Sequence, residues 1–266
     1  MTYLIRFFMI GLIFIWCFDV KSQTSIGAIA GEMVLVEAQE YSWRGLPTKL
    51  PNDYYVSKYE VTQGLWEAVT GYNPSYTVVG TKYPVDQMSW YDCIVFCNQL
   101  SEKLGLKPCY YSDETYTQVF GRRTDGSYEY LKNGNVLWNR NANGYRMPME
   151  AEWDYAARGG KYSKGTGYSG SNDLFKVGWF DQNNSPAGQK TVGQKLPNEL
   201  GIFDMSGNVM ECCFDLYFQR DNCLDFVSSS VIKSGDFDKS ELHCQIKTRT
   251  KFDPFWHIGL RLFRNK

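Results

Sequence analysis

Residues Pro197–Val209, with the sequence PNELGIFDMSGNV, decide the fold of this 266-residue chain. The stretch is rich in turn-forming residues, and Gly207 permits a tight turn that other residues resist. A second decisive stretch, Gly144–Pro148 (GYRMP), leads into a predicted helix over Met149–Arg158. A proline suits the start of a helix, and Gly159-Gly160 stop this one. After residue 160 we expect mostly loops and short strands.

Two further helices are predicted on the N-terminal side. Ser89, with Asp92 three residues later, resembles a capping box, so the clearest helix begins there. Its apolar residues recur at helical spacing until Gly105 ends it. A shorter helix is predicted from its cap, Thr62, to Gly71.

Four other segments have strand-like patterns. We expect strands at Met33–Val36, Tyr54–Val61 and Ile258–Arg264, and a hairpin around Tyr128–Trp138. The remaining sequence shows no fixed-period repeat and no second linker, which indicates one domain.

The composition indicates an aromatic, loop-rich globular protein. Aromatic residues make up 16% of the chain, and glycine occurs 24 times. The hydrophobic fraction of 43% is sufficient for a packed core. The formal net charge is −1 and the basic residues are scattered, so nucleic acid is not an expected partner.

The first 22 residues are predicted to be a signal peptide. Phe7–Phe18 is an unbroken apolar run, too short to span a bilayer and suited to the apolar region of such a peptide. Val20 and Ser22 are small enough for cleavage after Ser22. Retention as a membrane anchor, or lipidation at Cys17, are the alternatives. We therefore expect an exported protein with a lead at 23–31 and a domain at 32–266.

The order of short motifs resembles the formylglycine-generating enzyme (sulfatase-modifying factor) family along nearly the whole mature chain. The motifs that carry the resemblance are Lys58–Thr62 (KYEVT), Pro84-Val85, Ser89-Trp90, Gly144–Pro148, Glu150–Trp153, Ala156–Gly160, Pro197–Val209 and Ile258–Leu262. The resemblance implies an α+β, C-type-lectin-like fold with little regular secondary structure. Members of the family include copper oxidases, iron enzymes with a histidine triad, and binding domains without catalysis. The last group contains the variable proteins of diversity-generating retroelements.

The oxidase chemistry implied by the resemblance requires two cysteines that hold copper(I). In this chain the matching turn is Ser234–Phe237, which places Lys239 at the first cysteine position and Cys244 at the second. One thiol and one ammonium do not make that site, so copper is not expected. Cys244 would be the catalytic residue if the protein were an enzyme. An iron centre with three histidines is excluded, because the chain contains two histidines, His243 and His257. A site of two histidines and one carboxylate is possible on count alone, but both histidines lie in the tail that matches the family poorly.

Seven cysteines remain after removal of the first 22 residues. In an oxidising compartment some of them would form disulfides. Cys97 can bond to Cys109 across the end of its helix. The family resemblance places Cys213 after the Gly-Asn-Val motif and implies a structural disulfide from Cys213 to Cys244.

A structural calcium ion is also implied by the resemblance. In the family, the turn matching residues 204–211 wraps such an ion. Here carboxylates of Asp204 and Glu211, with carbonyls of Gly207 and Val209, would supply its oxygen ligands. The alternative is a turn whose carboxylates accept backbone N–H groups without a metal.

Two hypotheses of function follow. The first is a non-catalytic protein that binds an extracellular or envelope protein or glycan. Its candidate binding residues replace the degraded catalytic segment: Asp236, Phe237, Asp238, Lys239, Phe255, Trp256 and His257. The second is an oxidase that modifies a protein cysteine. A structural partner of a larger envelope assembly is a third, weaker interpretation.

Overall fold

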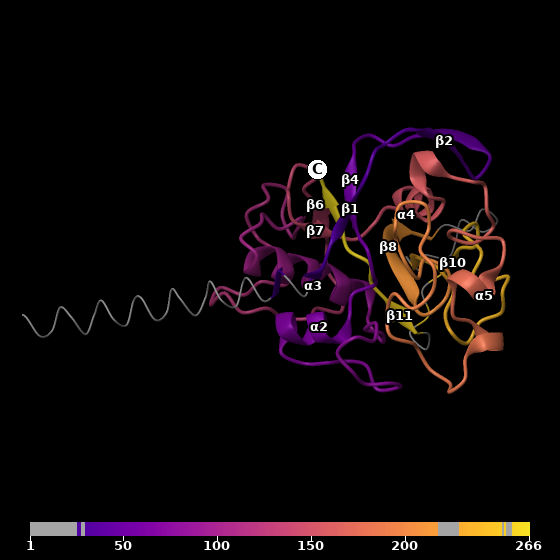
Figure 1. The fold of residues 1–266 in the computed structure, drawn as a ribbon. Coiled ribbons are helices and arrows are strands. Elements are labelled where there is room, and N and C mark those ends of the chain that lie inside the picture. Colours follow the sequence, from indigo (N-terminus) through magenta and orange to yellow (C-terminus); the bar gives the residue numbers. More distant parts are fainter. Residues whose placement is uncertain (1–25, 28–29, 218–228, 252, 254–256) are drawn as a thin grey trace, which may run out of the picture.

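The computed structural model describes residues 26–27, 30–217, 229–251, 253 and 257–266. Two four-stranded sheets organise this part of the chain (Figure 1). The predicted signal peptide and its alternatives lie outside the described residues. Within them, no helix has the length and apolar character needed to cross a membrane.

The first sheet is antiparallel and joins distant parts of the chain. Its strand order is β1 (Met33–Val36), β4 (Tyr54–Ser57), β12 (Phe263–Asn265) and β7 (Tyr145–Arg146). Strand β1 has the predicted bounds, whereas β4 is shorter than the segment predicted over Tyr54–Val61. The C-terminal strand therefore pairs with an early strand and with a central one.

The second sheet contains both parallel and antiparallel pairs. Its order is β10 (Thr250–Lys251), β9 (Ser230–Lys233), β8 (Met210–Leu216) and β11 (Ile258–Gly259). Strand β11 runs parallel to β8, and the other pairs are antiparallel.

Two small hairpin-like pairs complete the strands. The β2–β3 hairpin (Glu40–Trp43 and Leu46–Lys49) extends at the top of Figure 1. Strand β5 (Tyr110–Tyr111) pairs with β6 (Leu137–Trp138). The hairpin predicted around residues 128–138 is therefore wrong, because its second half pairs with β5 instead.

The predicted helices are confirmed, with small changes at their ends. They are α2 (Gln63–Thr70), α3 (Trp90–Lys103) and α4 (Glu150–Ala157), joined by the short α5 (Leu174–Val177) and the 3-10 turns η1 (Gly160–Tyr162) and η2 (Asp181–Asn183). Ser89 Oγ accepts the Asp92 N–H at 3.1 Å and Asp92 Oδ2 accepts the Ser89 N–H at 2.8 Å. This is the predicted capping box. The αL conformation of Gly71 ends α2, as expected.

Aromatic side chains fill two main cores. One core lies under α2 and α3, where Trp66 stacks on Phe96 with ring centroids 4.5 Å apart. The second surrounds Trp153 of α4 and includes Tyr54 and Phe263 of the first sheet. Ile26 and Ala30, from the predicted lead, are buried in the first core. The α+β, loop-rich fold class expected from the sequence is confirmed.

The predicted terminal strand over Ile258–Arg264 is divided between the two sheets. Residues Ile258–Gly259 pair with β8 and Phe263–Asn265 pair with β4 and β7. The side chain of Arg261 is fully buried where the chain crosses from one sheet to the other. This crossing brings the C-terminal motif against the decisive turn at residues 204–211.

Candidate functional site

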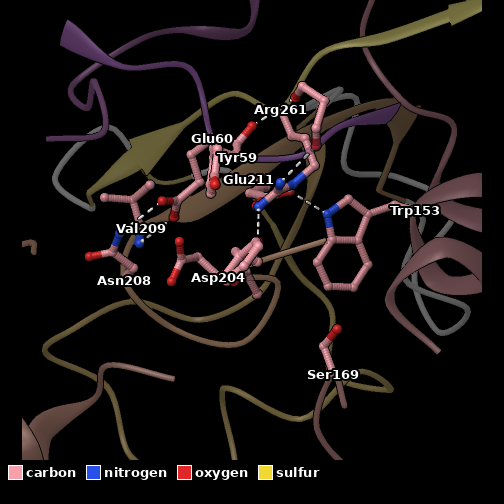
Figure 2. Close-up of polar contacts among 12 residues, drawn as sticks. Tyr59, Glu60, Trp153, Ser169, Asp204, Asn208, Val209, Glu211 and Arg261 are labelled. Atoms are coloured by element: carbon pink, nitrogen blue, oxygen red, sulfur yellow. Dashed lines mark hydrogen bonds and ion pairs between the residues drawn. The ribbon is translucent and has the colours of Figure 1, made fainter. Parts of the chain in front are cut away.

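The turn that decides the fold is attached to a buried polar network (Figure 2). Arg261 donates to both carboxylate oxygens of Glu211, with Nη2 2.7 Å from Oε1 and Nε 3.0 Å from Oε2. Trp153 Nε1 also donates to Glu211 Oε2, at 2.5 Å. Because Arg261 and Glu211 are both fully buried, their pairing is needed to offset the cost of desolvation.

Two more carboxylates lie in the same network. Glu60 accepts Asn208 Nδ2 at 2.8 Å and the Val209 N–H at 3.2 Å, and Asp204 Oδ2 accepts the Gly193 N–H at 2.6 Å. Burial raises the pKa of Glu60 well above its usual range and raises that of Asp204 to about 6. Three carboxylates and one guanidinium in a closed interior make this network a part of the scaffold and not a surface for a ligand.

The predicted calcium residues do not form an open cage of oxygens. Both oxygens of Glu211 are engaged by Arg261 and Trp153, and the Gly207 carbonyl accepts Ser234 Oγ at 3.1 Å. Asp204 Oδ1 is buried without a hydrogen-bond partner among the described residues. Within that part of the chain, His, Cys, Asp and Glu form no group of three suited to a metal. Calcium at this turn would have to displace Arg261 from Glu211, and its binding stays a prediction.

The same turn positions the candidate binding segment. The Gly207 N–H donates to Ser234 O at 2.8 Å, and the Phe237 N–H donates to Asn208 O at 2.9 Å. Gly207 is required here because it has a φ of 89° and a Cβ would lie 2.1 Å from the carbonyl oxygen of Trp179. The motif therefore fixes the segment at residues 234–237 directly.

A polar cluster lies where this segment meets the start of β11. We call it the His257 cluster, and it consists of Asp86, Asp236, Phe237, Lys239 and His257. His257 Nδ1 is 2.9 Å from Asp86 Oδ2, and the His257 ring packs on Phe237 with centroids 4.4 Å apart. Lys239 Nζ is 3.9 Å from Asp236 Oδ2. The side chains of Lys239 and His257 are partly exposed, whereas both carboxylates are fully buried.

Each acidic residue of this cluster lies close to an unusual backbone conformation: Asp236 two residues after Ser234, and Asp86 directly before Gln87. Ser234 has a φ of 81° and Gln87 a φ of 65°, in the left-handed region that residues with side chains rarely adopt. Such conformations persist only where the surrounding structure holds them, and they concentrate at functional sites. Burial raises the pKa of Asp236, and the Lys239 ammonium opposes that rise.

Cys244 lies behind this cluster and is not exposed. It packs with Tyr168, Leu174, Val177 and Phe180 in a small core. Burial, with the nearby carboxylate of Asp236, raises the pKa of its thiol to about 12. Without a metal the thiol is therefore protonated at neutral pH, which disfavours its attack on a substrate.

Neither predicted disulfide is present, which corrects both pairings. Cys97, Cys109, Cys213 and Cys244 are all free and buried thiols. Cys213 packs in the core around Trp153, whereas Cys244 packs in the separate core under Phe180. Cys97 and Cys109 share a core, but Cys109 Sγ donates to the Gly144 carbonyl at 3.4 Å.

The structure brings most of the candidate binding residues together. Asp236, Phe237, Lys239 and His257 belong to the His257 cluster, and Asp238 is exposed beside it. Phe255 and Trp256 lie outside the described residues. Sequence reasoning missed Asp86, which follows the Pro84-Val85 motif and reaches His257 across 171 residues. It also missed Glu60 and Arg261 as partners, although both are within quoted motifs.

The sheets, the loop-rich architecture and the turn at residues 204–211, held by the buried Glu211–Arg261 ion pair, define a protein with the formylglycine-generating-enzyme type of fold. The chain belongs to the family described as sulfatase-modifying factor enzyme 1-like domain, whose model matches residues 30–266.

Three similar proteins illustrate the range of this fold. A relative from Paenibacillus barcinonensis, named "Chaperone protein LppX", is 38% identical over an alignment of 238 positions that covers 81% of each chain. The structure of Treponema denticola variable protein 1 is 29% identical, with a TM-score of 0.71 over 88% of this chain and 95% of that one. The structure of CarF, 23% identical, has a TM-score of 0.72 over 90% of this chain and 99% of its own, and shows the fold alone.

Proposed function

We propose that this protein is an exported, non-catalytic binding protein whose ligand is another polypeptide. The proposal depends on the residues at the two positions where the family's oxidases have their copper-binding cysteines. Lys239 stands at one position, and Cys244 at the other is buried with its thiol pKa raised to about 12. A copper(I) site needs two thiolates, and this segment offers an ammonium and only one thiol.

The binding role is supported by what has replaced that pair. The His257 cluster combines charged side chains, an aromatic ring and strained backbone next to the scaffold turn. Polypeptide is chosen over glycan because the relative from Paenibacillus barcinonensis is named a chaperone protein. Export is supported by the apolar run at Phe7–Phe18.

A chemical assay tests the non-catalytic half of the proposal. The protein is incubated in air with copper, a reductant and a cysteine peptide of the sulfatase type, and the peptide mass is followed. We expect no conversion to formylglycine. Conversion above that of Cys244→Ala would overturn the proposal and establish the oxidase.

A binding assay tests the other half. Reduced and alkylated lysozyme and α-lactalbumin serve as unfolded probes, one basic and one acidic, and their native forms serve as controls. We expect at least one unfolded chain to bind more tightly than its native form, measured by fluorescence anisotropy. Equal, negligible binding of all four probes would contradict a role in binding polypeptides of this kind.

A further inference from the structure

Two buried cysteines from distant parts of the chain face each other in the first core. Cys93 lies on α3 and Cys212 lies on β8, and both side chains are fully buried in the core under α2 and α3. The two thiols share a hydrogen bond. Helix α3 packs against β8, so the pair connects an N-terminal helix directly to the second sheet.

The alternation of side chains along β8 decides which of its cysteines meets α3. Successive residues of a strand point to opposite faces of a sheet. Cys213 accordingly packs in the core around Trp153, whereas Cys212 packs in the core with Cys93. Cys212 Sγ also lies 3.5 Å from Ser230 Oγ of β9. The cysteine of β8 that has a cysteine partner is therefore Cys212 and not Cys213.

The other two thiols of this core have different contacts. Cys97 follows Cys93 by one helical turn and interacts with Cys93 and Cys212 electrostatically. Cys109 Sγ donates to the Gly144 carbonyl at 3.4 Å. Cys93 and Cys212 are thus the pair whose sulfurs are directed at each other.

We propose that Cys93 and Cys212 form a disulfide when the chain folds in the presence of a disulfide oxidant, and that this bond joins α3 to β8. The structure contains the reduced form. One cysteine thiolate attacks the disulfide of the oxidant, which forms a mixed disulfide and releases one thiol. The second cysteine thiolate attacks the protein sulfur of the mixed disulfide and releases the second thiol. The oxidant thereby takes up the two electrons and the two protons that the cysteines lose.

The bond forms during folding, because the folded core encloses both sulfurs. The hydrogen bond with Cys212, together with burial, raises the pKa of the Cys93 thiol well above its usual range. Little thiolate is then present to attack an oxidant. Protein that has already folded in its reduced form therefore keeps both thiols. Export, as in the proposed function, would supply an oxidising compartment, but the pairing does not depend on the ligand.

Oxidative refolding tests the pairing. The full chain with Cys17→Ser and Cys223→Ser is unfolded under reducing conditions and refolded with reduced and oxidised glutathione. The remaining thiols are alkylated, and peptide mapping without reductant locates any bond. We expect a bond between Cys93 and Cys212, with the other four described cysteines alkylated. Refolding with reduced glutathione alone should leave all six alkylated.

Thermal unfolding of matched variants measures what the bond does. The oxidised chain should melt at least about 5 °C above the reduced chain, because a cross-link restricts the unfolded state. Cys93→Ala and Cys212→Ala should each abolish this difference. Cys97→Ala, at an equally buried position one turn along α3, should keep it. Each comparison is between the oxidised and reduced forms of one variant, so the cost of the lost thiol cancels.

Three results would each overturn this inference. They are six free thiols after refolding with the oxidant, a bond between another pair such as Cys97 and Cys109, and a difference in melting temperature that survives Cys93→Ala. None of these measurements involves a ligand, and the assay with unfolded lysozyme and α-lactalbumin involves no disulfide of this chain. The inference and the proposed function therefore succeed or fail separately.

Discussion

At the residue scale, the position of Cys244 shows how the fold suppresses a reactive group. Its Sγ lies 4.0 Å from the carbonyl of Asp236 and is enclosed by Phe180 and its neighbours. A thiolate there would be desolvated and close to carboxylates, so the thiol form is favoured. The other described cysteines are also buried.

Thiol labelling tests this burial. In a variant with Cys17 and Cys223 changed to serine, we expect a maleimide reagent to leave the native protein unlabelled. All six described cysteines should react after unfolding in denaturant without reductant, because each is a free thiol. Mass spectrometry counts the labels. Fewer than six labels on the unfolded chain would reveal a disulfide and restore one of the pairings expected from sequence.

Through Asp215, the free energy of unfolding should depend on pH. Burial raises its pKa in the folded protein to about 6, although its Oδ2 accepts the Glu150 N–H at 2.6 Å. The unfolded value is about 3.9. Its stabilising contribution is therefore complete below about pH 4 and is lost as pH rises through about 6.

The variant Asp215→Asn isolates this contribution, because asparagine does not ionise. The unfolding free energy of the variant minus that of the natural chain should rise by about 2 kcal/mol between about pH 4 and 7. This value is reduced for the partial exposure of the Asp215 side chain. Denaturant unfolding at several pH values measures it. A constant difference across that range would show that Asp215 titrates normally.

At the element scale, the crossing from β11 to β12 depends on Arg261. Its guanidinium bonds to Glu211 on β8, to Ser57 O at the end of β4 and to Phe203 O in the decisive stretch. One side chain thus joins both sheets to the turn that identifies the family. Glu60 and Asp204 add two further carboxylates to its surroundings.

Replacement of Arg261 by methionine should therefore be strongly destabilising. The loss should be about 3–5 kcal/mol, because Glu211 would be buried without its cation. Thermal unfolding measures the change, and Arg264→Met, on the half-buried surface of β12, is the matched control. Adding Glu211→Gln should recover part of the loss by removing the uncompensated charge. A melting temperature unchanged by Arg261→Met would contradict this account.

Calcium is tested by the same melting experiment. The contacts of Glu211 favour an unchanged melting temperature in millimolar calcium, because its oxygens are already paired. A rise that disappears in Asp204→Ala would instead support the predicted calcium site at residues 204–211, since a ligand of the native state stabilises it.

At the scale of the whole molecule, the family motifs and the His257 cluster have different places in the fold. The motifs at residues 58–62, 197–209 and 258–262 meet in the closed interior and hold the two sheets together. The His257 cluster lies on loops attached to that interior. Similarity to both a chaperone-named relative and a variable protein agrees with one scaffold that carries different sites.

The sequence by itself determined the family, the fold class and the positions of the three longer helices, because these depend on local signals. Ser89 with Asp92, Thr62 and Gly71 act within a few residues of themselves, and the motif order needs no coordinates. Lys239 in place of a cysteine was also visible from local sequence.

Only the tertiary structure decided which distant groups meet. Asp86 contacts His257, and Arg261 forms an ion pair with Glu211. Cys213 and Cys244 lie in separate cores. Strand pairing and packing decide all three arrangements. The division of the terminal strand between two sheets was not predictable from its pattern, because a short apolar run specifies no partner. Burial then raised the pKa values of Cys244 and Asp236, since desolvation depends on everything that surrounds a group.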